Sequence, residues 1–441
     1  MIVHCRNLIH ALSRRRRGLL CVLAGLLLLA AAAGVGAPYL RAWYHYEAGQ
    51  RALERRAFAE AREHASVCLA VWPSGARSRL LAARAARRAG LLEEAQQHLD
   101  ACPSAPDILE DRQLERILLN VQRGGLAEVE KFLREQVELE HPQSPAILEA
   151  LTWEWMRTFR LGDTLPALEV WRQRQPRDPE PLVRHGWVCE HLFRRTEAVD
   201  DYRHALALDP HRDPVRQRLA EILVSLNQSD EAAEQFEYLV RKRPEDSAML
   251  LGLARCRFNQ SRLEEAEGLL DDLLARQPDM PAALGERGRL ALAQRQPERA
   301  ESWLRLAATA LPHDREIIYN LVRCLERLDK HADAEEHSAR LRRIDEDLAR
   351  MGGLIQQVLK TPNSASLRHD IGVLFLRNGF LEDGVNWLRT ALEQDPSYRP
   401  AHQALAEHYR RTGKLDAAER HRRAAAASHG NGSPHQPETL P

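Results

Sequence analysis

The residues best suited to bind a ligand in this sequence are arginines that recur at a fixed spacing. Arg255, Arg289 and Arg323 follow one another at intervals of 34 residues. A guanidinium group is planar and can hold a carboxylate through two parallel hydrogen bonds. A ladder of three such groups would suit an extended acidic peptide. Because arginine makes up about an eighth of the chain, the alternative is that the series is an ordinary solvated surface.

No motif typical of an enzyme accompanies these arginines. The sequence contains no HExxH, no G-x-S-x-G and no glycine-rich phosphate loop. Its 19 histidines are scattered, and close pairs such as His185 and His191 are six residues apart, which directs them to different sides of a helix. We therefore expect a protein without catalytic activity, cofactor or bound metal.

The cysteines favour a packing role over a chemical one. No CxxC occurs among the seven cysteines, so neither a redox motif nor a zinc site is indicated. Cysteine often behaves as a small buried hydrophobic residue. We expect this role for the five that lie in the repeats described next: Cys68, Cys102, Cys189, Cys256 and Cys324.

The interval of 34 residues extends far beyond the arginines. A small residue, usually alanine, recurs at this interval, with one step of 35 and one interruption: Ala61, Ala95, Val129, Thr164, Ala198, Ala232, Ala266, Ala300, Ala334, Gly384 and Ala418. Another small residue often lies twelve positions earlier, and a proline often lies twelve positions later. Small residues let two helices cross closely, and proline ends a helix. Each period predicts a helical hairpin that buries its apolar face by stacking on its neighbours.

Two local expectations follow from this register. Turns between the helices often contain a residue that tolerates positive φ: Gly90, Gly124, Asn227, Gly379 and Gly413. We also expect Ala232 to be buried at a helix crossing and its neighbour Ala233 to be exposed.

The periods resemble tetratricopeptide repeats. The fullest match is residues 179–212, which carry the family's signature of small residue, alanine, aromatic residue, alanine and proline: Gly186, Ala198, Tyr202, Ala205 and Pro210. The resemblance implies an all-α fold, a right-handed α-solenoid of about eleven hairpins. Units 110–143 and 145–178 depart from the signature, because Ile117, Val129, Thr152 and Thr164 replace its small residues.

The resemblance also indicates where a partner would bind. In this family the first helix of each hairpin lines a concave groove. Carrying over the groove-facing positions gives the candidate partner-binding residues: Trp187, His191, Gln217, Glu221, Arg255, Phe258, Asn259, Arg289, Tyr319 and Arg323. The Lys and Asn pattern of chaperone-binding members does not occur in any consecutive trio of units.

The N-terminus predicts a membrane anchor. Residues 18–40 contain no charge and would span about 34 Å as a helix, against a hydrocarbon core of about 30 Å. Arg14–Arg17 precede them, so residues 1–17 should stay in the cytoplasm and the repeats should lie on the other side. The location would be periplasmic in a bacterium.

Two alternatives to the anchor are open. One is a cleaved signal peptide, ending near Ala33 or Ala37, which would leave a secreted or periplasmic protein. The other is a soluble helix. The aromatic residues that follow, Tyr39, Trp43, Tyr44 and Tyr46, fit the interfacial belt of a membrane, but they could also begin the core of the first repeat.

The remaining chain divides by the repeat pattern. We expect a repeat array at 42–348, a helical insert at 349–364 with helical apolar spacing, two further repeats at 365–432 and a disordered tail at 433–441.

Composition and the repeats together indicate a class of function. The 63 basic and 63 acidic residues balance, which gives no support for nonspecific nucleic-acid binding, because that needs a basic face, so no nucleic-acid partner is expected. We therefore expect a membrane-anchored scaffold that binds other proteins or extended peptide segments on the extracytoplasmic side. The alternative is an accessory subunit that presents substrates to a separately encoded secretion, polysaccharide-export or glycosyl-transfer machine.

Overall fold

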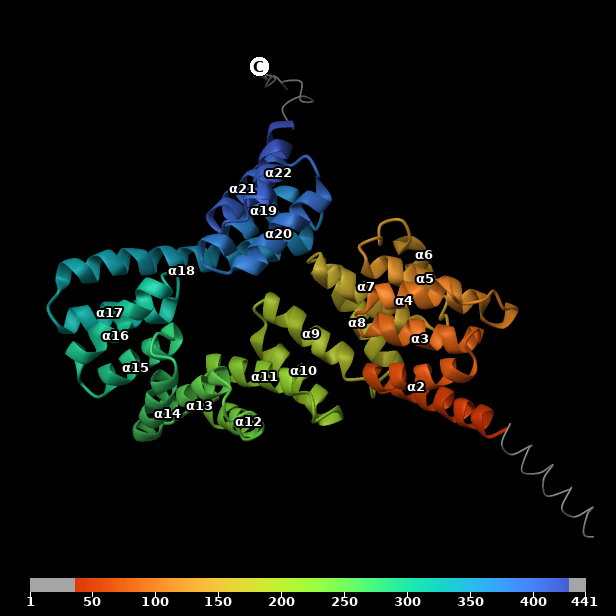
Figure 1. The fold of residues 1–441 in the computed structure, drawn as a ribbon. Helices are drawn as coiled ribbons and strands as arrows, with labels where there is room; N and C mark the ends of the chain where they lie inside the picture. The colour runs from red at the N-terminus through yellow and green to blue at the C-terminus, as the bar shows by residue number, and fades with distance from the viewer. Residues whose placement is uncertain (1–35, 428–441) are drawn as a thin grey trace, which may run out of the picture. The chain divides into compact units, whose positions relative to one another are not determined.

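Every regular element of the described chain is a helix, which confirms the predicted all-α fold for that part. The structure is a computed structural model and describes residues 36–427. The chain divides into two compact units, Met1–Glu138 and Leu139–Pro441. After a helix over residues 36–54, the first unit contains α2 Phe58–Val71, α3 Ala76–Arg88, α4 Leu92–Asp100, the 3₁₀ turn Pro106–Ile108, α5 Leu109–Gln122 and α6 Glu130–Glu138 (Figure 1).

The second unit continues the same alternation of helices and short turns. Its helices are α7 Ser144–Arg157, α8 Leu161–Arg174, α9 Glu180–His191, α10 Arg195–Leu208, α11 Asp213–Ser225, α12 Ser229–Lys242, α13 Ser247–Asn259, α14 Leu263–Arg276, α15 Pro281–Ala293, α16 Pro297–Ala310, α17 Arg315–Arg327, α18 His331–Lys360, α19 Ala365–Arg377, α20 Leu381–Gln394, α21 Arg399–Arg411 and α22 Leu415–Ala427. Consecutive helices pack against each other, so the core runs along the stack and not through one centre.

The small residues lie where the two helices of a hairpin cross. A Cβ atom added to Gly186 of α9 would lie 2.6 Å from the ring of Tyr202 on α10. The corresponding atom on Gly288 of α15 would lie 2.5 Å from Leu304 of α16. Since carbon atoms do not approach this closely without a clash, glycine at these positions sets the distance between the helices.

The turn inside each hairpin contains one residue with positive φ. All five residues expected in this conformation adopt it: Gly90, Gly124, Asn227, Gly379 and Gly413. The same position in other hairpins is filled by residues that rarely adopt positive φ, Arg56, Phe159, Phe193, Ser261 and Arg295, and in one hairpin by Asp329. The turn is thus imposed by the two packed helices even where the local sequence does not favour it.

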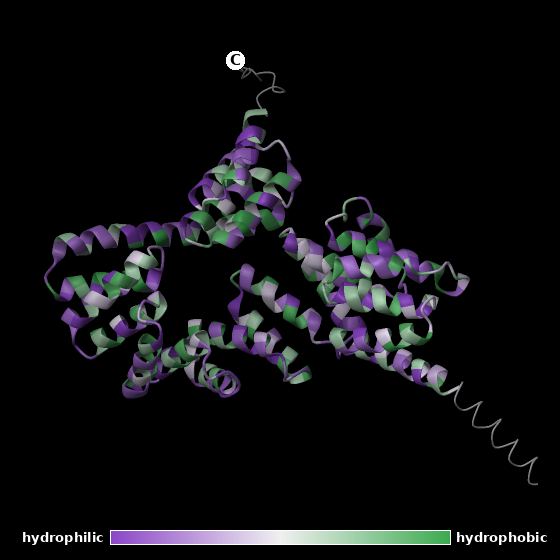
Figure 2. Cartoon of the chain, in the orientation of Figure 1, coloured by the Kyte–Doolittle hydropathy of each residue, from purple (hydrophilic) through white to green (hydrophobic). Residues whose placement is uncertain are grey.

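One expectation about burial is wrong. Ala232 is fully buried, as expected, but Ala233 is buried as well. Helix α12 packs on α11 of its own hairpin and on α13 of the next one, so its buried face is wider than a single crossing requires. Figure 2 shows the resulting pattern, in which hydrophobic and hydrophilic residues alternate around the helices.

The two units separate between the hairpins that depart from the repeat signature. Helix α6 buries only Leu133, and the next helix, α7, begins the second unit. Val129 precedes α6 at the position where alanine or glycine elsewhere permits close packing.

Helix α18 interrupts the regular alternation in the second unit. It runs for 30 residues and includes the first part of the insert expected at 349–364. Its C-terminal half buries Met351, Ile355 and Val358, which follow helical spacing. Gly352 and Gly353 lie within it without breaking it.

Hairpins far apart in the sequence meet within the second unit. Arg368 of α19 is almost fully buried, and its Nη1 atom donates a hydrogen bond of 2.9 Å to the carbonyl oxygen of Thr158, which follows α7. The rings of Phe159 and Trp387 lie 4.4 Å apart between their centroids. We call this contact of α7–α8 with α19–α20 the seam. Through it the stack of hairpins in this unit closes on itself.

The predicted membrane anchor, residues 18–40, lies almost entirely in 1–35, outside the described residues. Within residues 36–427, none of the helices combines the length and the apolar character that crossing a bilayer requires. The tail expected at 433–441 also lies outside the described residues.

Candidate functional site

A cavity of about 930 Å³ lies on the first helices of four successive hairpins, α11, α13, α15 and α17. We call it the arginine cavity, because six arginines line it: Arg255, Arg289, Arg295, Arg315, Arg323 and Arg327. Of the ten predicted partner-binding residues, seven line it: Glu221, Arg255, Phe258, Asn259, Arg289, Tyr319 and Arg323. The 34-residue spacing therefore does bring the three arginines of the ladder to one surface.

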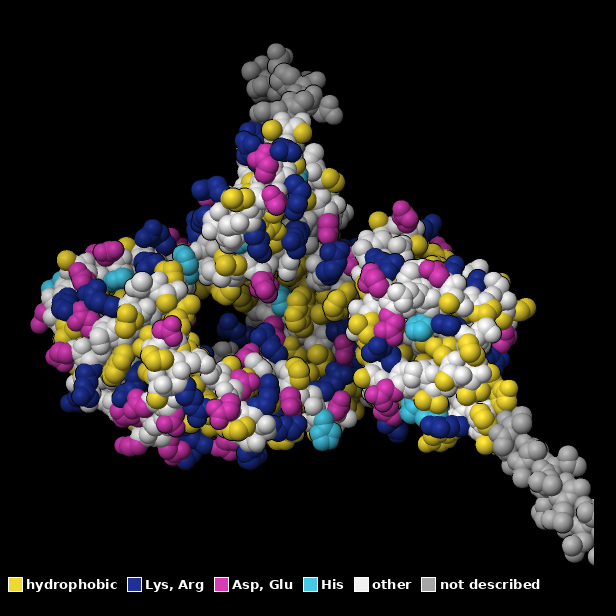
Figure 3. All heavy atoms as spheres, in the orientation of Figure 1, with side chains coloured by type: hydrophobic (Ala, Val, Ile, Leu, Met, Phe, Trp, Pro, Cys, Tyr) yellow, Lys and Arg dark blue, Asp and Glu magenta, His cyan; other side chains and the backbone are white. Residues whose placement is uncertain are grey.

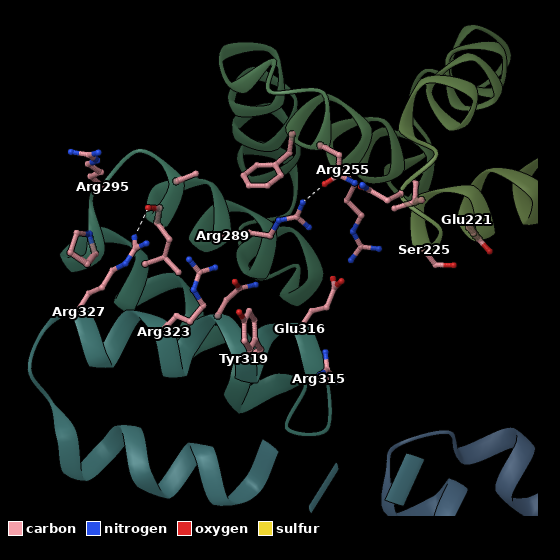
Figure 4. A pocket seen from close by; sticks show the side chains of 18 residues that line it. Glu221, Ser225, Arg255, Arg289, Arg295, Arg315, Glu316, Tyr319, Arg323 and Arg327 are labelled. Carbon is pink, nitrogen blue, oxygen red and sulfur yellow. Dashed lines mark hydrogen bonds between the residues drawn. The ribbon is translucent and has the colours of Figure 1, made fainter. Parts of the chain in front are cut away.

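The side chains of the ladder point into a common space. Figure 4 shows Arg255, Arg289 and Arg323 extending from three different helices toward one another, with Glu316 and Tyr319 beside them on α17. Each arginine holds the same position in its repeat, so stacking of the repeats places their side chains in one row.

A buried carboxylate holds two of the three guanidinium groups. Glu286 of α15 lies beneath the cavity and accepts a hydrogen bond of 2.7 Å from Nε of Arg255. Its second oxygen lies 3.2 Å from Nη1 of Arg289. Burial alone would lower the pKa of Arg255, but the charge of Glu286 outweighs it and the pKa is raised. Arg255 therefore stays charged, and Glu286 fixes both guanidinium groups in position.

Aromatic rings and an amide complete the positioning. The guanidinium carbon of Arg289 lies 3.9 Å from the ring centroid of Phe258, and its Nη2 atom donates a 2.5 Å hydrogen bond to Oδ1 of Asn259. Arg323 lies over the ring of Tyr319 at 5.6 Å. Within the described residues, no acceptor or carboxylate lies within bonding distance of the Arg323 guanidinium. Arg323 is therefore the member of the ladder most available to a ligand.

The structure adds two residues that the sequence did not identify, Glu286 and Arg295, and it also brings to the cavity Arg327, which holds a groove-facing repeat position. Glu286 was missed because the repeat pattern does not reveal which charged residue of a helix is buried. Arg295 follows α15 in the positive-φ turn, and nothing in its local sequence indicates that it reaches the cavity. Arg327 donates a hydrogen bond of 2.8 Å to the carbonyl oxygen of Leu292, which ties α17 to α15.

Three predicted residues lie away from the arginine cavity. The rings of Trp187 and His191 stack on α9 with centroids 3.7 Å apart, and both contact Phe159 at the seam. Burial lowers the pKa of His191. Gln217 is half-buried on α11 and donates a 2.9 Å hydrogen bond to Glu221. The predicted continuous row of ten residues is thus divided between two places.

One further cluster combines residue types found in catalytic and metal sites. Nδ1 of His185 lies 2.6 Å from Asp201 Oδ2 and 3.5 Å from Cys189 Sγ. A catalytic relay needs both imidazole nitrogens, whereas here one nitrogen makes both contacts. The hydrogen bond to Asp201 raises the pKa of His185 to about 10, so a metal ion would have to displace a tightly held proton. The cluster is best described as a structural ion pair.

The cysteines in the described residues are all buried and free, as expected for packing residues. Burial raises the pKa of Cys256 to about 12 and that of Cys324 to about 11. A thiol that resists deprotonation is a poor nucleophile, which agrees with a packing role.

The chemistry of the arginine cavity suits the binding of anionic groups. Six arginines face two lining carboxylates, Glu221 and Glu316, so the cavity favours anionic groups. Apolar contact is available at Phe258, Leu292 and Tyr319. On the face visible in Figure 3, basic and acidic side chains are interspersed over the hairpins.

Comparison with known proteins supports the repeat assignment. The tetratricopeptide repeat family matches residues 218–281, 258–315 and 369–432. The chain therefore contains tetratricopeptide repeats in these segments. Of the helices that line the arginine cavity, the matched segments include all of α13 and α15 but only the first residue of α17, Arg315. No curated protein matches the chain.

Solved structures are similar over part of the chain. PilW, a type IV pilus biogenesis factor, is 20% identical, with a TM-score of 0.38, over 45% of this chain and 92% of its own. PilF of Pseudomonas aeruginosa is 16% identical, with a TM-score of 0.36, over 46% and 92%. A tetratricopeptide repeat protein of Parabacteroides merdae is 17% identical, with a TM-score of 0.33, over 65% and 99%.

Proposed function

We propose that this protein is a membrane-anchored, non-enzymatic scaffold that binds an extended acidic segment of another protein in the arginine cavity. The observation that carries the proposal is the convergence of Arg255, Arg289 and Arg323 from three hairpins on one cavity. Their guanidinium groups are already oriented, which reduces the entropy that a ligand would lose on binding.

The form of the cavity favours an extended segment over a folded domain. Its lining comes from one side of a row of parallel first helices, which offers a succession of similar sites along the stack. Carboxylates would pair with the arginines, and an apolar side chain would contact Phe258 or Tyr319. Arginine and aromatic residues together are typical of the positions that dominate binding energy.

The membrane part of the proposal rests on the sequence. Arg14–Arg17 and the uncharged residues 18–40 favour an anchor with the repeats on the extracytoplasmic side. A reporter that is active only outside the cytoplasm, fused after Pro441, should be active. Activity of a cytoplasmic reporter at the same site would contradict this orientation.

Binding can be tested with a defined probe. We would measure the fluorescence anisotropy of a labelled peptide of alternating glutamate and leucine, with a lysine-for-glutamate peptide as the negative probe. Arg323→Ala is the cleanest variant, because Arg323 holds no carboxylate in the folded protein. The variant should bind the acidic peptide about tenfold more weakly, a loss of about 1.4 kcal/mol in binding free energy. This difference in affinity should become smaller at high salt.

A variant that removes all three arginines of the ladder needs a compensating substitution at Glu286. Removal of Arg255 and Arg289 would leave Glu286 buried without a partner, which destabilises the fold on its own. The triple arginine-to-alanine variant should therefore carry Glu286→Gln. The matched control changes three exposed arginines of the same hairpins, Arg262, Arg276 and Arg299, to alanine. Equal affinity of the ladder and control variants for the acidic peptide would exclude the cavity as the binding site.

A further inference from the structure

The first described helix presents an unusual aromatic face. Four large apolar residues at its start are exposed: Tyr39 (51%), Leu40 (70%), Trp43 (61%) and Tyr44 (60%). We call them the aromatic face. Single exposed apolar residues are normal on a soluble protein, but four within six positions form a continuous patch. The patch needs a partner of its own.

The helix register shows that the aromatic face is not a misplaced core. Residues at i, i+1, i+4 and i+5 lie on one side of a helix. The other side is the packed one, where Ala42, Ala52 and Leu53 are buried. Of the two roles that the sequence allowed for these aromatics, a place in the core of the first repeat is therefore excluded for Trp43 and Tyr44.

Polarity changes along the helix at the level of the aromatic face. The uncharged residues 18–40 lead into the aromatic face and include its first two members. One to three turns beyond Tyr44, the same side of the helix carries Glu47, Arg51 and Glu54. Between Tyr39 and Tyr44 the helix rises about 7.5 Å. The interfacial layer on each side of a bilayer is about 5–7 Å thick, so the aromatic face matches it in depth.

The patch continues onto the next helix. The ring of Trp72, which follows α2, lies 6.2 Å from that of Tyr39 between centroids. Arg41 is exposed within the same stretch and offers a positive charge to lipid phosphates. Trp and Tyr rings combine an apolar body with a polar N–H or O–H group, which suits the boundary between lipid chains and water.

We infer that the aromatic face lies in the interfacial layer of a lipid bilayer and holds the first hairpin against the membrane surface. This inference rests on the membrane attachment proposed above and extends it. The first hairpin is then seated on the lipid and is not merely tethered to it. The occupant is the bilayer, because the uncharged stretch that ends at Leu40 leads directly into the face.

The test uses the quenching of tryptophan fluorescence by brominated lipid. The full chain is reconstituted into phosphatidylcholine vesicles whose acyl chains are brominated near the head group, with unbrominated vesicles as the reference. We expect part of the emission to be quenched. The quenched part should fall in Trp43→Phe and disappear in Trp43→Phe/Trp72→Phe. Trp153 of α7 is also half exposed and serves as the control, so Trp153→Phe should leave the quenched part unchanged.

The outcomes separate this inference from the membrane attachment itself. If the protein floats with the vesicles but Trp43→Phe keeps the full quenching, the anchor holds and the seated hairpin is excluded. If the protein does not float with the vesicles, both are overturned. A Trp43 emission that is unquenched and shifts with protein concentration would assign the aromatic face to a contact between two copies of the chain.

Discussion

At the scale of single residues, the side chain at the helix crossing decides how closely a hairpin packs. Gly186 leaves room for the ring of Tyr202, whose hydroxyl donates a 2.5 Å hydrogen bond to Glu190. The ring is thus held at both its face and its end, so it cannot move aside for a larger neighbour. The glycine of the repeat signature is required here for space and not for backbone freedom.

We expect Gly186→Ala to destabilise the protein by about 1–3 kcal/mol through overpacking. Gly268 is the matched control. It also lies inside a helix, α14, but an added Cβ atom would meet nothing within 4 Å. Gly268→Ala should stabilise by about 0.5–1 kcal/mol, because alanine restricts the unfolded chain. Thermal unfolding measures both, and a change of the same sign in the two variants would contradict the assigned crossing.

At the scale of elements, ion pairs join many of the hairpins to the next one. Several connect residues 28–32 positions apart, such as Arg62 with Glu94, Arg203 with Glu231 and Arg255 with Glu286. This offset is slightly shorter than one repeat, so it joins neighbouring helices in the stack. Part of the large and balanced set of charged residues therefore forms ion pairs between neighbouring repeats. The arginines of the cavity belong to the same system.

The pair of Arg87 and Glu115 is the most deeply buried of these links, with both side chains 1% exposed. Arg87→Met leaves the buried carboxylate of Glu115 with only the partly exposed Arg84, whose Nε atom lies 3.7 Å away, and should cost up to about 3–5 kcal/mol. The double variant Arg87→Met/Glu115→Leu should recover most of that loss, because no charge then remains buried.

An exposed pair in the same unit provides the control. Arg77 and Asp107 lie 2.8 Å apart with side chains 65% and 50% exposed. Arg77→Met should cost less than about 1 kcal/mol. Denaturant unfolding of the four proteins tests the comparison. A double variant as unstable as Arg87→Met would show that shape and not charge makes this position sensitive.

At the scale of the molecule, the seam decides that the second unit closes on itself. The buried Arg368 donates to neutral oxygens, the carbonyls of Thr158 and Pro362 and the hydroxyl of Thr390. Burial lowers its pKa to about 10. A guanidinium held in this way is sensitive to loss of any partner, because an unpaired buried polar group is costly.

We expect Arg368→Met to loosen the seam. The carbonyl of Thr158 then loses its donor, and hydrogen exchange should become faster in peptides covering 155–162 and 385–392. The core of the arginine hairpins, α13–α17, should exchange as before. Arg410→Met, at an arginine that is 65% exposed, is the control and should change none of these regions. Unchanged exchange at both peptides in Arg368→Met would show that Phe159 and Trp387 suffice to close the unit.

The features that follow the 34-residue period could be predicted from the sequence. The 34-residue spacing predicted helical hairpins, the close approach at Gly186, the positive φ of Gly90 and the common surface of Arg255, Arg289 and Arg323. These follow from the sequence because each repeat contacts mainly its neighbours, so the position of a residue within its repeat specifies its surroundings.

Tertiary structure alone decided the features that break the period. The seam joins Arg368 to Thr158 across 210 residues, and no repeat position encodes that contact. It separates Trp187 and His191 from the arginine cavity, although all ten candidates follow one rule of position. Burial of Ala233 and the role of Glu286 likewise depend on a second neighbouring helix. Small rotations between hairpins add up along a stack, so the sum, and not any single repeat, decides which distant surfaces meet.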